Sequence, residues 1–249
     1  MLLDAVLTKS RTFLTSDKQQ RPPVAVFDLD ETLLDSRARA VRVMRDLAQN
    51  TEIQCRFLYE SGRLLELTSR TNFRFQSFVL CPERMIRDEA GINSAPFLEY
   101  ASPLYLQNYL SSRYCCDDDA IEGAPEFVRE LHARGTTIVY LTGRNAPNME
   151  TGTRSALLSN GFPLDSQTVL LMKPAPEIPD SSFKGSALDK IRDLGEAIAA
   201  FDNESNHLNT AHKHFPCAIL GFVDTIHSDD SSTPDPSAFW IKNFLRRKS

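Results

Sequence analysis

VAVFDLDETLLD, residues 24 to 35, is the stretch that decides the fold. It opens with four apolar residues after the breaker Pro22-Pro23, and it turns acidic at Asp28-Leu29-Asp30. A short apolar run with such limits predicts a strand that is buried in a sheet. Two carboxylates therefore stand at the carboxyl end of that strand.

Downstream, apolar runs alternate with segments of helical spacing. This alternation indicates an α/β fold, in which helices cover both faces of a parallel sheet. Such sheets bind ligands at the carboxyl ends of their strands. Thr142 and Asp202, like Asp28, each follow a predicted strand, so all three are expected at one crevice. The predicted strands are residues 24–27, 136–141, 168–172, 197–201 and 218–223, and the predicted helices are residues 126–133 and 186–194.

Both ends of the chain also predict helices. Near the N-terminus, Leu3, Val6 and Leu7 share one side of a short amphipathic helix. Residues 238–247 are expected to form a closing helix that packs Trp240, Ile241 and Phe244 inward.

Residues 36–116 differ in kind from their flanks. They hold eleven arginines, no lysine and eight carboxylates, a net charge of +3, whereas the remainder of the chain carries -8. Apolar residues such as Val41, Met44 and Ala48 recur at helical spacing. The segment contains ten aromatic residues, enough to give a helical subdomain its own small core.

Composition limits the classes of function. The net charge of -5 argues against nonspecific binding of nucleic acid, which requires a basic surface. The five cysteines form an odd number and no CxxC pair, which favours a reducing compartment over disulfides or structural zinc. We find no apolar run long enough for a signal peptide or a membrane span, so a cytoplasmic location is expected.

Three motifs in order resemble the haloacid dehalogenase (HAD) superfamily. FDLDETLLD at residues 27–35 is similar to its first motif, residues 139–144 (VYLTGR) to its second, and residues 200–204 (AFDNE) to its fourth. The resemblance covers the chain from about residue 24 onward. It implies a HAD-like (Rossmannoid) parallel sheet core with a small all-α cap, divided as residues 1–35 and 117–249 for the core and 36–116 for the cap.

The resemblance also implies a reaction, the hydrolysis of a phosphoric ester on a small phosphorylated metabolite. In it, Asp28 attacks phosphorus to form an aspartyl-phosphate, and Asp30 acts as general acid and then base. Mg²⁺ offsets the charge, and its ligands are Asp28, the main-chain carbonyl of Asp30, and Asp202. Thr142 and the backbone N–H of Gly143 bind the phosphoryl group.

A lysine should complete the phosphate site, and two candidates remain. Lys173 lies in KPAP, which is similar to a lysine motif in one branch of the superfamily, but Pro179 argues for continued loop after it. Lys184 is preferred because Ser186 is a suitable helix N-cap, which would put Lys184 just ahead of a helix N-terminus. The fourth motif departs from the common pair of aspartates, since Glu204 and Asn206 follow Asp202, and this leaves the outer metal shell open.

Other polar residues have simpler interpretations. Asp117, Asp118 and Asp119 are read as a solvated acidic linker, and His207, His212 and His214 as surface residues of a helix. Arg144 either contacts the substrate or caps the sheet edge, and the sequence does not separate the two.

The same residues bear on alternative functions. Dehalogenation is disfavoured because Asp30 and Asp202 have no task in it. Phosphotransfer with the same residues and a catalytically silent phospho-ligand-binding module remain alternatives. Nucleic-acid and membrane partners are not expected, and the sequence leaves the substrate and the oligomeric state open.

Overall fold

The computed structural model describes residues 2–15, 21–229 and 232–246. Its contacts divide the chain into two compact units. The first consists of Met1–Asp35, Ala120–Glu150 and Leu157–Ser249, and the second of Ser36–Asp119 and Thr151–Ala156. In the described part, we find no helix with the length and apolar character needed to cross a membrane.

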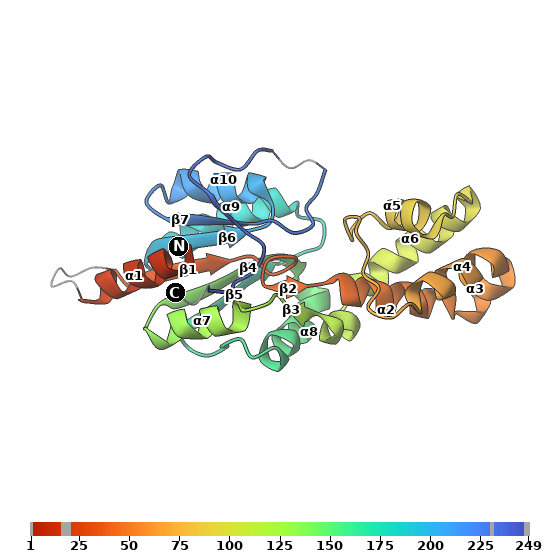
Figure 1. Cartoon of the computed structure of the whole chain (residues 1–249), viewed down its shortest axis with the longest axis horizontal. Helices are drawn as coiled ribbons and strands as arrows, with labels where there is room; N and C mark the ends of the chain where they lie inside the picture. The colour runs from red at the N-terminus through yellow and green to blue at the C-terminus, as the bar shows by residue number, and fades with distance from the viewer. Residues whose placement is uncertain (1, 16–20, 230–231, 247–249) are drawn as a thin grey trace. The chain divides into compact units, whose positions relative to one another are not determined.

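A six-stranded parallel sheet forms the centre of the first unit (Figure 1). Its order is β5-β4-β1-β6-β7-β8, and every neighbouring pair is parallel. The α/β fold predicted from the alternation of strands and helices is confirmed. The strands are β1 (Pro23–Phe27), β4 (Thr137–Asn145), β5 (Thr168–Lys173), β6 (Glu196–Asp202), β7 (Ile219–Val223) and β8 (Phe239–Ile241).

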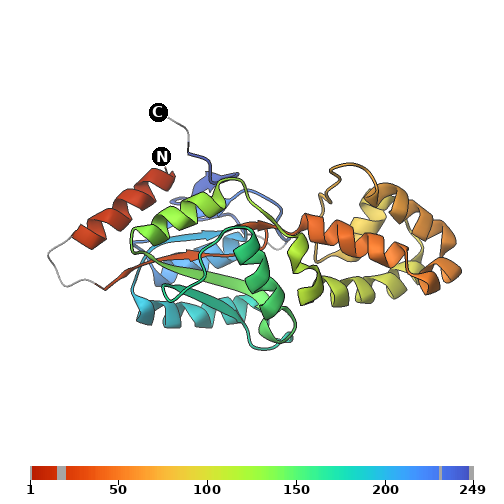
Figure 2. The same ribbon diagram turned by 90° about the horizontal axis from the view of Figure 1, so that it is seen from below.

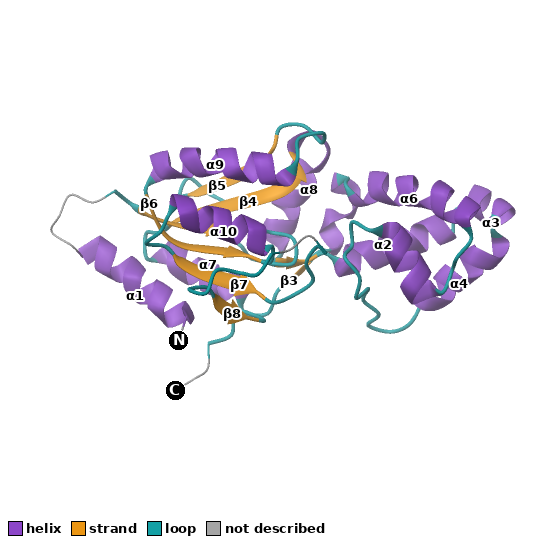
Figure 3. Ribbon diagram, turned by 90° about the horizontal axis from the view of Figure 1, so that it is seen from above, coloured by secondary structure: helices purple, strands orange, loops and turns teal. Residues whose placement is uncertain are grey.

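Helices cover both faces of this sheet. On one face α1 (Leu2–Thr15) packs beside α7 (Ala124–Ala133), as Figure 2 also shows. On the other face α9 (Asp180–Leu194) and α10 (Ser205–His214) lie together over β4 and β6 (Figure 3). The predicted N-terminal helix is confirmed, and its Leu3, Val6 and Leu7 are buried.

The register of the central strands aligns their carboxyl ends. Phe27, the last residue of β1, lies opposite Tyr140 of β4 and Phe201 of β6. The Phe27 and Phe201 rings stack with centroids 5.0 Å apart, which holds the two strand ends at one level. Asp28 and Asp202 each follow one of these phenylalanines and therefore emerge side by side.

Three predictions of local structure were wrong. β4 continues to Asn145, so Thr142 lies within the strand rather than after it. α9 begins at Asp180 and not near Ser186, because Pro179 adopts an extended N-cap conformation from which the helix can start. The tail pairs with β7 as the short strand β8, which leaves Trp240 59% exposed while Phe244 packs into the core. Arg247, the end of the predicted tail helix, lies outside the described residues.

The second unit is helical and has its own core. The described part contains α2 (Arg37–Ala48), α3 (Thr51–Arg56), α4 (Leu58–Thr68), α5 (Pro82–Arg84), α6 (Ala95–Tyr109), the π-helical turn η1 (Met85–Glu89) and the 3₁₀ turn η2 (Ser112–Asp117). The predicted apolar face of Val41, Met44 and Ala48 is buried. The sequence predicts an insert of residues 36–116, whereas this unit runs from Ser36 to Asp119 and also includes Thr151–Ala156 of α8 (Ala146–Ser159).

An ion pair lies inside this helical unit. The Arg39 guanidinium is buried and contacts the Asp118 carboxylate at 2.9 Å. It also donates to the main-chain oxygen of Tyr109 and lies over the Tyr109 ring. The interpretation of Asp118 as part of a solvated linker was therefore wrong, because its side chain is the counter-ion of a buried arginine. Asp118 leads into β3 (Asp119–Ala120), which pairs with β2 (Leu34–Asp35) in a second, two-stranded sheet.

Candidate active site

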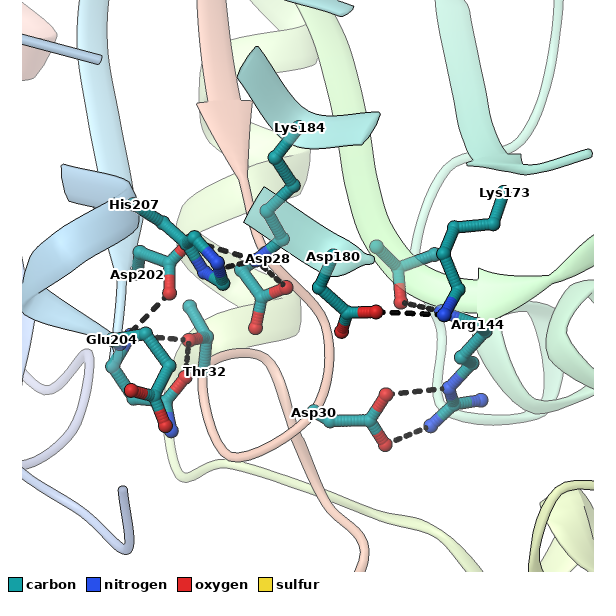
Figure 4. A network of polar contacts seen from close by, with 12 residues as sticks. Asp28, Asp30, Thr32, Arg144, Lys173, Asp180, Lys184, Asp202, Glu204 and His207 are labelled. Carbon is teal, nitrogen blue, oxygen red and sulfur yellow. Dashed lines mark hydrogen bonds and ion pairs between the residues drawn. The ribbon is translucent and has the colours of Figure 1, made fainter. Parts of the chain in front are cut away.

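Three charged side chains meet at the carboxyl ends of β1 and β6 (Figure 4). The Lys184 ammonium donates to Asp28 Oδ1 at 2.7 Å and to Asp202 Oδ2 at 2.8 Å. All three side chains are buried. The two carboxylates come from neighbouring strands, and the lysine enters from the second turn of α9.

Burial and charge shift the proton affinities of these groups. Burial raises the pKa of Asp28 to about 7, since the lysine only partly offsets the lost solvation and the Asp202 carboxylate adds to the rise. Burial alone would also raise the pKa of Asp202, but the Lys184 ammonium lowers it to about 2. Burial lowers the pKa of Lys184 while Asp202 and Asp28 raise it, and the net shift is upward. One ammonium thus balances two carboxylates incompletely.

Asp30 has a different partner. Arg144 Nε and Arg144 Nη2 donate to the two Asp30 carboxylate oxygens at 2.8 Å and 2.7 Å. Figure 4 shows this fork directed away from the Asp28–Lys184 contact. The sequence left two interpretations of Arg144, substrate contact or a cap on the sheet edge, and its contact here is with Asp30.

The second predicted motif lies in β4 beside this pair. Thr142 is buried, and its hydroxyl accepts from the Arg144 N–H at 3.2 Å. A methyl group at Gly143 would overlap the carboxylate of Asp180, so a side chain there would have to displace that carboxylate. The same Asp180 carboxylate binds Lys173 at 2.7 Å. Lys173 therefore pairs with Asp180, whereas Lys184 pairs with Asp28 and Asp202.

The loop after β6 ties the first and fourth motifs together. Asn203 N–H donates to the Thr32 hydroxyl at 3.0 Å, and the Glu204 N–H donates to Asp202 Oδ1 at 2.8 Å. The Glu204 carboxylate turns away and accepts from the backbone and hydroxyl of Ser228. Asn206 is exposed in the first turn of α10. Glu204 thus holds the loop around Ser228 against the fourth motif in this structure.

The family model of haloacid dehalogenase-like hydrolases matches residues 22–212. The chain belongs to this family. Among curated proteins, none matches it.

Several solved structures have a similar fold. A putative phosphatase from Clostridium difficile has a TM-score of 0.55 at 13% identity, over 91% of this chain and 96% of that one. CbbY from Rhodobacter sphaeroides, in complex with phosphate, has a TM-score of 0.50 at 15% identity, over 90% and 95%. YfnB from Bacillus subtilis, bound to magnesium, has a TM-score of 0.50 at 13% identity, over 90% and 96%. At these identities the likeness concerns the fold alone.

The donor set of this HAD-like chain fits a hard divalent cation. Among the described residues, we find no group of three or more His, Cys, Asp or Glu side chains that is placed to hold a metal ion. Two buried carboxylates, Asp28 and Asp202, do converge and are undercompensated by one ammonium. Mg²⁺ is usually held by one or two carboxylates together with waters and substrate phosphates. These residues therefore fit Mg²⁺.

His207 is a residue of the site that sequence reasoning missed. The sequence predicts a surface position for it, but its Nδ1 lies 3.2 Å from Lys184 Nζ and 3.7 Å from Asp202 Oδ2. Together with Asp28 these side chains line a pocket between α9, α10 and the sheet. The available signal was its position in the first turn of the helix that follows Asp202.

Proposed function

We propose that this HAD-like chain is a Mg²⁺-dependent phosphomonoester hydrolase that acts on a small phosphorylated metabolite through an aspartyl-phosphate at Asp28. The observation that carries the proposal is the bridge from Lys184 to both Asp28 and Asp202 at the carboxyl ends of β1 and β6. Parallel sheets bind ligands at this edge. A buried carboxylate held by an ammonium is oriented for attack on phosphorus.

The reaction would proceed in two displacements at phosphorus. An Asp28 carboxylate oxygen forms a bond to phosphorus while the bond to the ester oxygen breaks. Water then attacks the same phosphorus, which breaks the Asp28–phosphorus bond and releases inorganic phosphate. Lys184 orients Asp28, and the Thr142 hydroxyl and the Gly143 N–H bind phosphoryl oxygens.

Asp30 would transfer the protons. It gives one to the departing ester oxygen and takes one from the attacking water. The fork from Arg144 holds both of its oxygens in the present arrangement. Catalysis by Asp30 therefore requires this fork to loosen when the substrate binds, and Arg144 would set the resting orientation of the carboxylate.

Asp28, Asp202 and the main-chain carbonyl of Asp30 would hold the cation. When bound, Mg²⁺ neutralises the carboxylates and the phosphoryl oxygens and so lowers the barrier to attack by an anion. A cation beside Asp28 would also keep this carboxylate ionised, which burial alone opposes.

The test is a screen of phosphorylated metabolites with Mg²⁺, in which released inorganic phosphate is measured for wild type and Asp28→Asn. We expect Asp28→Asn to lose essentially all turnover without loss of the fold, because an amide is a poor nucleophile. Asp189→Asn, an exposed aspartate of α9, is the matched control and should retain turnover. Turnover of Asp28→Asn within about tenfold of wild type would contradict the mechanism, and phosphate transfer to an added acceptor in place of water would indicate a phosphotransferase.

A further inference from the structure

The Lys184 ammonium has three acceptors, one for each of its hydrogens. Two are the carboxylates of Asp28 and Asp202, and the third is His207 Nδ1 at 3.2 Å. A lysine ammonium donates three hydrogen bonds and accepts none. The two carboxylates beside Lys184 keep it in the charged ammonium form, which has no lone pair to accept a hydrogen bond. Lys184 is therefore the donor to the histidine as well. His207 Nδ1 must then carry a lone pair, and the ring proton resides on Nε2.

The position of His207 is built into the fold. α10 begins at Ser205, directly after the loop that follows Asp202, so the third residue of the helix faces back toward the strand end. The imidazole is only 17% exposed and lines the same pocket as Lys184. Helix geometry, rather than a loop, therefore sets the distance between the imidazole and the ammonium.

The three acceptors are not equivalent. The ammonium is charged in all three bonds, but only the two carboxylates add the attraction of a full opposite charge. The contact with His207 is also the longest of the three. A phosphoryl oxygen that approaches Lys184 must replace one acceptor, because no fourth N–H exists. The neutral histidine is the acceptor that is most easily displaced.

We propose that His207 is a positioning residue that holds the third N–H of Lys184 in the free enzyme and releases it to a phosphoryl oxygen when phosphate binds. The proposal rests on the proposed phosphatase function for its second step, whereas its first step concerns the free protein alone. Without His207, the third N–H would be buried without this acceptor, which raises the free energy of the unbound protein. A bound phosphoryl oxygen would then supply the missing acceptor and remove this free-energy cost.

The first experiment determines the tautomer of the free wild-type protein without any turnover. Nitrogen-15 NMR of the imidazole, at about pH 8 where histidine is ordinarily neutral, should find the proton of His207 on Nε2 and an unprotonated Nδ1. H207F identifies the signal by its loss. A proton on Nδ1 would overturn the inference and leave the proposed hydrolysis untouched, whereas turnover by Asp28→Asn would overturn the hydrolysis and leave the tautomer standing.

The second experiment measures the Kd of inorganic phosphate by calorimetry in the presence of Mg²⁺. H207F keeps a ring in the same space and removes both nitrogens, so we expect it to bind phosphate about 3- to 10-fold more tightly. H207N, whose amide oxygen can stand where Nδ1 stands, should restore the wild-type Kd, whereas H207Q places its amide near the Nε2 position and should resemble H207F. H214F, on the last residue of α10, is the control and should leave the Kd unchanged. Unchanged or weaker phosphate binding by H207F, or equal behaviour of H207N and H207Q, would overturn the exchange.

Discussion

Replacing Lys184 with methionine should separate the two candidate lysines. The substitution leaves two buried carboxylates, whose side chains are 7% and 10% exposed, without their shared ammonium. Removing one partner of a buried ion pair costs about 3–5 kcal/mol of unfolding free energy. Because Lys184 lowers the pKa of Asp28, its loss favours a proton on Asp28 and relieves part of the repulsion. We therefore expect the lower end of the range, about 3 kcal/mol at neutral pH.

Lys173→Met is the matched control. Lys173 pairs with Asp180, whose side chain is 43% exposed, and pairs of this kind contribute about 0.2–1 kcal/mol. Urea unfolding in the presence of a chelator measures both differences, and the Tm of Lys184→Met should fall by roughly 6–12 °C. In kcat/KM, Lys184→Met should lose more than about tenfold and Lys173→Met less. Equal losses of stability and activity in the two variants, or the reverse order, would refute the reasoning and transfer the role to Lys173.

Three further outcomes are expected. Because the pKa of Asp28 is raised, the folded, metal-free protein keeps a proton that the unfolded chain has lost. The free energy of unfolding, relative to that of Asp28→Asn, should therefore fall as pH rises from about 4 to about 7. Urea titrations in chelator that give a constant difference between the two proteins would contradict this. Asp30→Asn should slow turnover by about 10²- to 10⁴-fold, with the smallest loss for aryl phosphates whose leaving group needs no proton, and equal losses on aryl and alkyl phosphates would reject the acid role. Arg39→Met should destabilise the helical unit by about 3–5 kcal/mol because it leaves the buried Asp118 carboxylate without its counter-ion. The double variant Arg39→Met, Asp118→Leu should recover most of this loss. A single variant as stable as wild type in thermal melting would show that the ion pair contributes nothing.

Local chemistry along the chain determined much of the fold. Apolar runs bounded by breakers predicted the strands that became β1, β4, β5, β6 and β7. In a parallel sheet covered by helices on both faces, strands read as nearly continuous apolar runs. The same runs place Asp28 directly after β1 and Asp202 at the last residue of β6, although β4 runs further than its apolar run predicts. Since neighbouring parallel strands end at one edge, the sequence alone was enough to bring these two carboxylates together.

Only the tertiary structure shows which side chains that are distant in sequence contact one another. Lys184 and Lys173 both precede Asp202 at acceptable spacing, and only the packing of α9 on β4 and β6 directs one to the carboxylates and the other to Asp180. The tail became β8 because the edge of β7 offered it backbone partners that no local propensity reveals. His207 and Arg144 likewise acquired their partners through the meeting of strand ends and helix turns, since a hydrogen bond depends on distances that are set only when the whole sheet is assembled.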